Sequence, residues 1–178
     1  MSEEKLPQKV DPFRFADNAI RLQGVLYVND LERLCDYLHK HSGEIRVDLT
    51  FGKNEQGIRF LTGKLSGHLQ LQCQRCMEDL AYEITNKIWL AIVHTEEEAA
   101  QLPSGYDAII VDNDILVIQD MIEDELIVSL PVVPMHHPNE CKVTLPLVIK
   151  SEQELETGKN NPFNVIDFLR VKQETDKK

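Results

Sequence analysis

The sequence predicts an α+β fold in which an antiparallel β meander is packed by two main helices. Apolar and polar residues alternate over residues 45–51, 61–73 and 82–93, which is the period-two pattern of strands with one buried face. Residues 30–42 and 118–130 carry apolar residues at helical spacing instead. The 178 residues suffice for one ordinary domain with a sizeable core. Partial closure of the meander into a barrel is an alternative.

Three segments are expected along the chain. Residues 1–11 are polar and predict a flexible N-terminus, and Asp11-Pro12 marks the start of ordered structure. Residues 12–142 form the single α+β domain. Residues 143–178 form an irregular C-terminal tail, in which Asn161-Pro162 predicts a short helix with Asn161 as its N-cap.

The first half of the domain begins with a short strand over residues 22–28. Asn29 and Glu32 then form a capping-box pattern, which predicts a helix that ends near Gly43. Cys35 lies on the apolar face of this helix and is interpreted as a small buried hydrophobe. In the long second strand of the meander, Phe60 has the opposite parity to Leu61 and Leu65, which predicts a bulge near Phe60.

The second half contains two short strands and a helix. Residues 107–111 and 115–117 are expected to form a small hairpin, and the helix over 118–130 ends before Pro131. Glu125 falls within the apolar stripe of that helix, so its carboxylate projects toward the core. The alternative is that the last turn frays and Glu125 reaches water.

Charge is distributed unevenly along this acidic chain. The formal net charge is −11, and residues 88–141 contain eleven acidic residues and no Lys or Arg. An acidic segment repels phosphate, so a nucleic acid would be contacted by the neutral remainder, which carries Arg59, Lys64, Arg75 and Lys87. The alternative interpretation is a solvated acidic face that keeps the protein soluble.

Cys73 and Cys76 form a Cys-x-x-Cys pair in the turn after the second meander strand. A chain without a secretory signal or a membrane-spanning apolar run is expected in the cytoplasm, where a disulfide framework is disfavoured. Backbone amides in such a turn stabilise thiolates, which favours metal binding. A thiol redox pair is the alternative, although such pairs more often precede a helix within a βαβ pattern.

A proline-rich segment supplies further ligands for a metal. His136, His137 and Cys141 follow Pro131 and Pro134, and a stiff backbone lowers the entropic cost of placing ligands. Together with the Cys-x-x-Cys pair, one histidine completes the Cys3His ligand set of a single structural Zn²⁺ site. Either histidine fits this spacing.

The order of these motifs resembles one family, the YceD family of bacterial large ribosomal RNA subunit accumulation proteins. The matching motifs are Cys73-Gln74-Arg75-Cys76, Glu123-Asp124-Glu125, Leu130-Pro131-Val132-Val133-Pro134, His136, Cys141 and Asn161-Pro162-Phe163. On this resemblance the metal ligands are Cys73, Cys76, His136 and Cys141, with His137 as a substitute for His136. Glu125 is expected to hydrogen-bond to a ligand histidine or to pair with Arg75.

The resemblance implies a non-enzymatic role in 23S ribosomal RNA accumulation or processing and in large-subunit biogenesis, with no catalytic residues. The expected partners are 23S rRNA or its precursor, a large-subunit ribosomal protein or an assembly factor. Two alternatives are a zinc-dependent RNA hydrolase, which would use His136 or His137 with Glu125 or the Asp112/Asp114 pair, and a thiol redox sensor.

Overall fold

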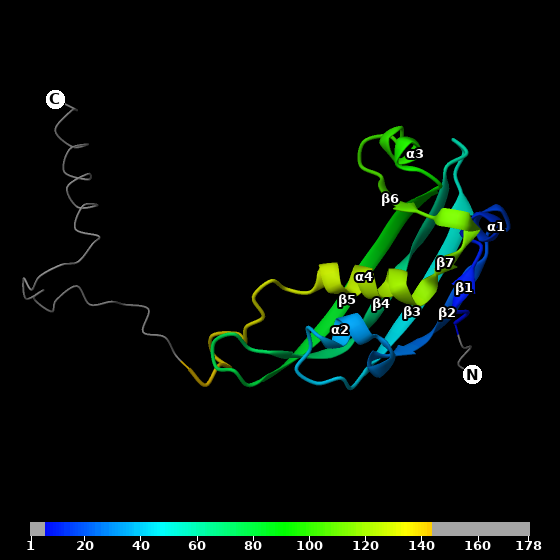
Figure 1. Ribbon diagram of the computed structural model, residues 1–178. Helices are drawn as coiled ribbons and strands as arrows, with labels where there is room; N and C mark the ends of the chain where they lie inside the picture. Colours follow the sequence, from blue (N-terminus) through cyan, green and yellow to red (C-terminus); the bar gives the residue numbers. More distant parts are fainter. Residues whose placement is uncertain (1–5, 144–178) are drawn as a thin grey trace, which may run out of the picture. The chain divides into compact units, whose positions relative to one another are not determined.

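A five-stranded sheet is the main element of the computed structural model, which describes residues 6–143. The strand order is β2-β3-β4-β5-β6, and Figure 1 shows the long central strands side by side. The strands are β2 (Arg21–Tyr27), β3 (Glu44–Lys53), β4 (Arg59–Gln72), β5 (Asp79–Val93) and β6 (Asp107–Ile110). A separate two-stranded sheet pairs β1 (Lys9–Val10) with β7 (Leu116–Val117).

The helical elements of the described residues are short, apart from the last. They are α1 (Pro12–Asp17), η1 (Val28–Asp30), α2 (Glu32–Cys35), α3 (Glu96–Ala100), η2 (Asp112–Asp114) and α4 (Ile118–Ser129). No helix among them is long and apolar enough to span a bilayer. The α+β class agrees with the sequence prediction. So does the antiparallel pairing of each strand from β2 to β5 with the next.

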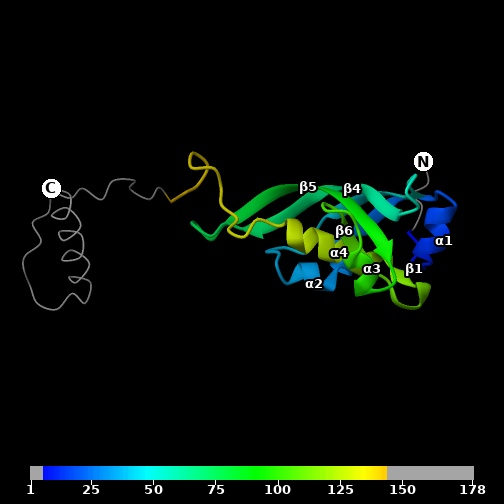
Figure 2. The same ribbon diagram turned by 90° about the horizontal axis from the view of Figure 1, so that it is seen from above.

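One face of the sheet carries the core. Figure 2 shows α2 and α4 on one side of the sheet, and no described helix covers the opposite side. Every second residue of the long strands points to the core, where Leu49, Leu65 and Ile88 are fully or almost fully buried. Gly63 lies on this face, where an added Cβ would be 2.2 Å from the Asp48 carbonyl oxygen. The opposite face, which we call the open face, presents polar side chains to solvent.

The prediction of a bulge near Phe60 is wrong. The register of β4 runs without a break against β3 from Arg59 to Gly67 and against β5 from Phe60 to Gln72. Phe60 has the parity of the open face, where its ring lies 6.2 Å from the ring of Trp89. An apolar side chain on each face therefore explains the break in alternation that suggested a bulge.

The sheet is open, so closure into a barrel is not observed in the described residues. Strands β2 and β6 form its two edges and do not pair with each other. The expected hairpin of residues 107–117 is also wrong, because β6 pairs in parallel with β5 and β7 pairs with β1. The connection through α3 returns the chain to the start of β6 and thereby permits the parallel pairing.

The helix expected from Asn29 to Gly43 is much shorter in the structure. Its α-helical part ends at Cys35, and the N–H groups of His39 and Lys40 bond to the carbonyl oxygen of Gln70 in β4. Pairing with a strand therefore replaces helical hydrogen bonds. The Asn29 side chain makes no capping bond to this segment, because η1 ends at Asp30 and α2 starts after Leu31. The helix expected after Asn161 lies outside the described residues.

Candidate metal centre

Four side chains with metal-binding atoms meet where the β4–β5 turn lies against the segment after α4. The ligand atoms of Cys73, Cys76, His136 and Cys141 all lie within 4.8 Å of one another. Three sulfur atoms and one imidazole nitrogen form a common zinc ligand set, and a tetrahedron with Zn–S bonds of about 2.3 Å requires comparable ligand separations. The residues present therefore fit a metal of this type.

The first two cysteines are held by a tight turn. The N–H of Cys73 donates to the carbonyl of Glu78 at 3.0 Å, and the N–H of Met77 donates to the carbonyl of Cys73 at 2.8 Å. Met77 adopts a φ of 61°, which is the left-handed conformation that closes such turns. Cys73 and Cys76 therefore face the same side at the end of the β4–β5 hairpin.

The second half of the site is attached to this turn through the backbone. The N–H of Gln74 donates to the carbonyl of Pro134 at 2.8 Å, and the N–H of His136 lies 3.4 Å from the Cys73 sulfur. Cys141 is buried and ends a turn that is closed by a hydrogen bond from its N–H to the His137 carbonyl. Pro131 and Pro134 thus carry an extended segment across the hairpin end, and the segment returns Cys141 to the cluster.

The site favours the thiolate form of Cys73. Burial raises the pKa of this thiol, but bonds from the N–H groups of Cys76, His136 and Arg75 outweigh burial and lower the pKa to about 5. The pKa of His136 shifts in the opposite direction, upward. Its hydrogen bond with Cys76 raises the pKa of His136, against the opposing effect of burial. The site therefore places a thiol that readily loses its proton next to an imidazole that readily gains one.

His136, and not His137, belongs to the group of four. Its Nδ1 atom lies 3.3 Å from the Cys76 sulfur, and its Nε2 atom lies 2.9 Å from the carbonyl oxygen of Asp79. An Nε2–H that donates to this carbonyl leaves the Nδ1 lone pair for a metal, which is a common arrangement around ligand histidines. The group that holds the orientation of the His136 ring is therefore the backbone carbonyl of Asp79.

The structure brings Glu125 to Asn86 and not to Arg75 or His136. The Asn86 side-chain amide donates to the carboxylate and to the backbone carbonyl of Glu125, at 3.3 and 3.0 Å. Asn86 lies on the core face of β5, so the helix does carry Glu125 toward the sheet, but at a distance from the turn that holds the ligands. Arg75 instead contacts the sulfur of Met135.

Sequence reasoning missed the buried carboxylate of α4, which is Glu123. Its side chain is 5% exposed and accepts bonds from Arg33 Nε and from the Leu34 N–H, each at 2.9 Å. Leu34 is the third residue of α2, so Glu123 caps this helix from another element. The residue lies to the side of the apolar stripe of α4, where periodicity alone gives no signal.

The four cations expected to contact RNA do not form one patch. Arg59 pairs with Asp17 at 2.9 Å and stacks over Phe13. Arg75 lies in the turn between Cys73 and Cys76. Lys64 and Lys87 alone are direct neighbours, because they face each other across β4 and β5 on the open face.

An open, mostly antiparallel sheet with a Cys3His cluster at one end defines a small α+β protein with a candidate structural metal centre. The YceD family model, described as large ribosomal RNA subunit accumulation protein YceD, matches residues 61–169. The large ribosomal RNA subunit accumulation protein YceD of Haemophilus influenzae is 31% identical over 177 residues, which cover 97% of this chain and 100% of the relative. The chain therefore belongs to the YceD family. No solved structure matches it.

Proposed function

We propose that this protein is a non-enzymatic factor for the accumulation of 23S ribosomal RNA and for biogenesis of the large ribosomal subunit. The observation that carries the proposal is the match over nearly the full chain to a protein named for large ribosomal RNA subunit accumulation. The ligand cluster supports a structural and not a catalytic role for a metal bound there, because four protein ligands complete a tetrahedral site and leave no position for substrate or water.

The ratio of 23S to 16S rRNA in cells that lack this protein tests the proposal. The ratio is expected to fall and to recover when the wild-type chain is supplied. An unchanged ratio would contradict a role in accumulation. Incubation of the purified chain with precursor 23S RNA and Mg²⁺ or Mn²⁺ tests the hydrolase alternative, and we expect the RNA to remain intact.

We further propose that Cys73, Cys76, His136 and Cys141 hold one structural Zn²⁺. The metal would join the β4–β5 hairpin end to the segment after α4, two parts of the chain about 60 residues apart, and would add to the hydrogen bonds between them. Bound zinc supplies a cross-link here and no reaction chemistry.

Zinc affinity is expected to fall as the pH is lowered from 8 to 5. The raised pKa of His136 means that a proton must leave Nδ1 before a metal can bind, and Cys73 becomes protonated as the pH falls through about 5. Titration with Co²⁺, followed by its thiolate absorption, measures this dependence. Affinity that stays constant from pH 8 to 5 would contradict ligation by these groups.

The open face offers the best RNA contact within the described residues. Lys64 and Lys87 are directly opposed, and like charges in such a position destabilise a sheet unless an anion lies between them. Asp48, the neighbour of Lys64 on β3, is already bonded to Arg21 at 2.6 and 2.8 Å. Neither lysine forms an ion pair with another of residues 6–143, so a phosphate would neutralise this pair of charges.

An aromatic side chain lies close to these lysines. Trp89 follows Lys87 by two residues on the same face and remains 41% exposed. Its ring packs against Tyr106 at 4.5 Å, which fixes its orientation. An exposed, supported indole beside two cations suits stacking of an unpaired base whose phosphates contact the lysines.

The double variant Lys64→Gln/Lys87→Gln is expected to bind a single-stranded 23S rRNA transcript about tenfold more weakly at low salt. The slope of log affinity against log salt should shrink by roughly one to two units, because two phosphate contacts are lost. Anisotropy titrations over a salt series measure both quantities.

Lys9→Gln/Lys53→Gln is the matched control, since it removes the same charge from exposed positions off the open face. Equal binding by the two double variants would show that RNA responds only to net charge and would contradict the proposed contact.

A further inference from the structure

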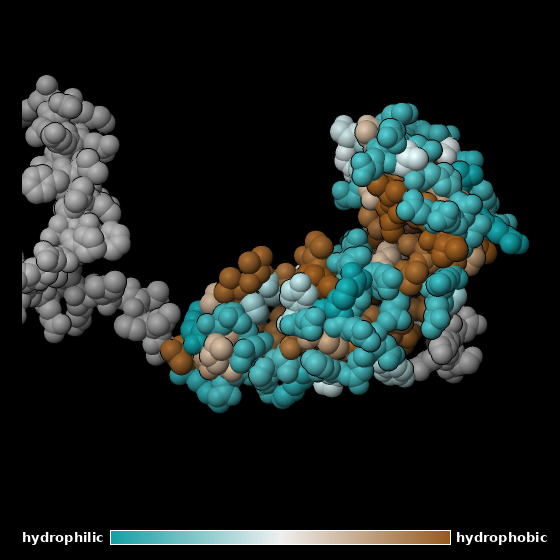
Figure 3. All heavy atoms as spheres, viewed as in Figure 1, coloured by the Kyte–Doolittle hydropathy of each residue, from teal (hydrophilic) through white to brown (hydrophobic). Residues whose placement is uncertain are grey.

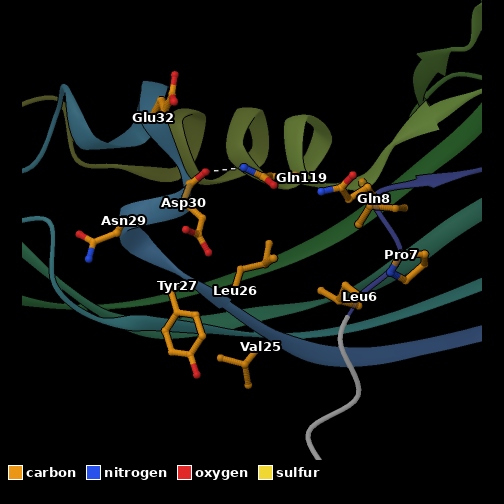
Figure 4. Close-up of a pocket in the computed structure, with 11 residues that line it drawn as sticks. Leu6, Pro7, Gln8, Val25, Leu26, Tyr27, Asn29, Asp30, Glu32 and Gln119 are labelled. Carbon is orange, nitrogen blue, oxygen red and sulfur yellow. Dashed lines mark hydrogen bonds between the residues drawn. The ribbon is translucent and has the colours of Figure 1, made fainter.

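A groove of about 730 Å³ lies between the edge strand β2, the segment before β1 and the start of α4. Figure 4 shows Leu6, Leu26 and Asp30 around the same space, with Gln119 of α4 bonded to the backbone of Asp30. The lining residues are Leu6, Pro7, Gln8, Val25, Leu26, Tyr27, Asn29, Asp30, Glu32, Ile118 and Gln119. The groove lies outside the candidate metal centre and involves none of the cations discussed for RNA.

The edge of β2 presents unpaired backbone groups to this groove. The N–H of Phe51 bonds to Ile20 and the N–H of Val28 bonds to Gly43, so the even-numbered residues from 20 to 28 pair with β3. The N–H and C=O groups of Val25 and Tyr27 therefore point away from β3, toward the free edge. Such an edge is a template for one more strand.

The side chains around the groove favour a particular kind of added strand. Leu26 is half-buried and lies beside the buried Leu6 and Ile118, so the peptide side chains that face α4 would meet an apolar wall. Asp30 and Glu32 are exposed and form no ion pair within the described residues, and no Lys or Arg lines the groove. The local charge is therefore negative and complements a basic partner.

We propose that this groove binds an extended basic segment of another protein, which adds as a strand to the free edge of β2. Apolar residues of the segment that face α4 would contact Leu6 and Leu26, while Lys or Arg residues at the end of the segment next to η1 would lie near Asp30 and Glu32. The inference rests on the groove alone, so it stands or fails independently of the RNA contact on the open face.

A labelled strand-forming peptide of valine and threonine, with two lysines at each end, tests the proposal against the full-length protein by fluorescence anisotropy. The peptide is expected to bind, and an equally long peptide with glutamate in place of lysine is expected to bind at least about tenfold more weakly. Asp30→Asn/Glu32→Gln should reduce this difference, whereas Glu96→Gln/Glu97→Gln on α3 should leave it unchanged. Equal binding of the basic and acidic peptides would overturn the proposal.

Proline at position 25 tests strand addition itself. Val25→Pro removes an N–H that points to the groove without removing a β2–β3 bond, and should weaken peptide binding roughly five- to tenfold. Gln23→Pro is the matched control, because its N–H also points outward but Gln23 does not line the groove. Equal affinities of the two proline variants would overturn strand addition.

Hydrogen exchange on the wild-type protein provides a test that does not depend on a variant that folds. The Val25 and Tyr27 amides should exchange more slowly once the basic peptide is bound. Unchanged exchange at both amides would contradict the proposal. Sedimentation that reveals a wild-type dimer, and a monomer for Val25→Pro, would instead make a second copy of the chain the occupant and would also overturn it.

Discussion

Replacing Cys73 with serine is expected to weaken zinc binding by more than about 100-fold and to lower the melting temperature of the zinc-loaded protein by about 10 °C. The reason is that Cys73 supplies a buried sulfur that three backbone N–H groups hold as a thiolate. A hydroxyl at this position is a poor ligand for zinc. Zinc titration and calorimetric melts with and without a chelator measure the two effects.

Cys35→Ser is the matched control for this change. Cys35 is half-buried and its sulfur lies 3.2 Å from the Val28 carbonyl, away from the ligand cluster. Serine can keep this hydrogen bond, so zinc affinity should remain unchanged. A second control concerns Cys73→Ser itself. Once a chelator has removed the zinc, its melting temperature should differ little from that of chelator-treated wild type. Equal zinc affinity in Cys73→Ser and Cys35→Ser would contradict the ligand set.

Replacing Glu123 with alanine is expected to lower the free energy of unfolding by about 2–3 kcal/mol. The change leaves the buried Leu34 N–H without an acceptor and removes the partner of Arg33 Nε. The estimate stays below that for a fully buried pair, because half of the Arg33 side chain is exposed to solvent. Urea denaturation measures the loss.

Asp124→Ala provides the comparison within the same helix. Asp124 also pairs with Arg33, but its side chain is 62% exposed, so its loss should cost less than about 1 kcal/mol. The contrast separates the capping of α2 by a buried carboxylate from a surface ion pair. Equal destabilisation by the two substitutions would contradict a capping role for Glu123.

Glu123 and Arg33 also explain why a helix as short as α2 is present. The sequence pattern assigned its cap to Asn29 and Glu32, which are local residues. In the structure, the N-cap residue Leu31 makes no side-chain bond, and the cap comes from a residue about 90 positions away. Helix capping across such a separation depends on tertiary packing, which a local motif does not describe.

Local alternation predicted the strands of the meander well, because each has one buried face. It failed where neighbours at a distance decide the structure. The pairing of β6 with β5 depends on where α3 returns the chain, and β7 pairs with residues 9–10, which were expected to be flexible. Phe60 belongs to an aromatic cluster on the open face, and that cluster is visible only once β4 and β5 are aligned.

The candidate site was predicted more completely than the fold around it. Cysteine spacing and the order of motifs indicated Cys73, Cys76, His136 and Cys141, and the structure brings these four together. Residues that support the ligands could not be predicted in the same way. The Asp79 carbonyl is a backbone group without a sequence signal, and Glu125 bonds to Asn86, a pairing set by how α4 crosses β5.

The metal content of the protein tests most directly whether these residues form a zinc centre. Native mass spectrometry of the full-length chain, purified without chelators, is predicted to show one zinc ion per chain. The Cys141→Ser variant, prepared in the same way, is predicted to show none or a readily lost ion. A wild-type chain that carries no metal after purification and takes up no zinc on titration would contradict the proposed centre.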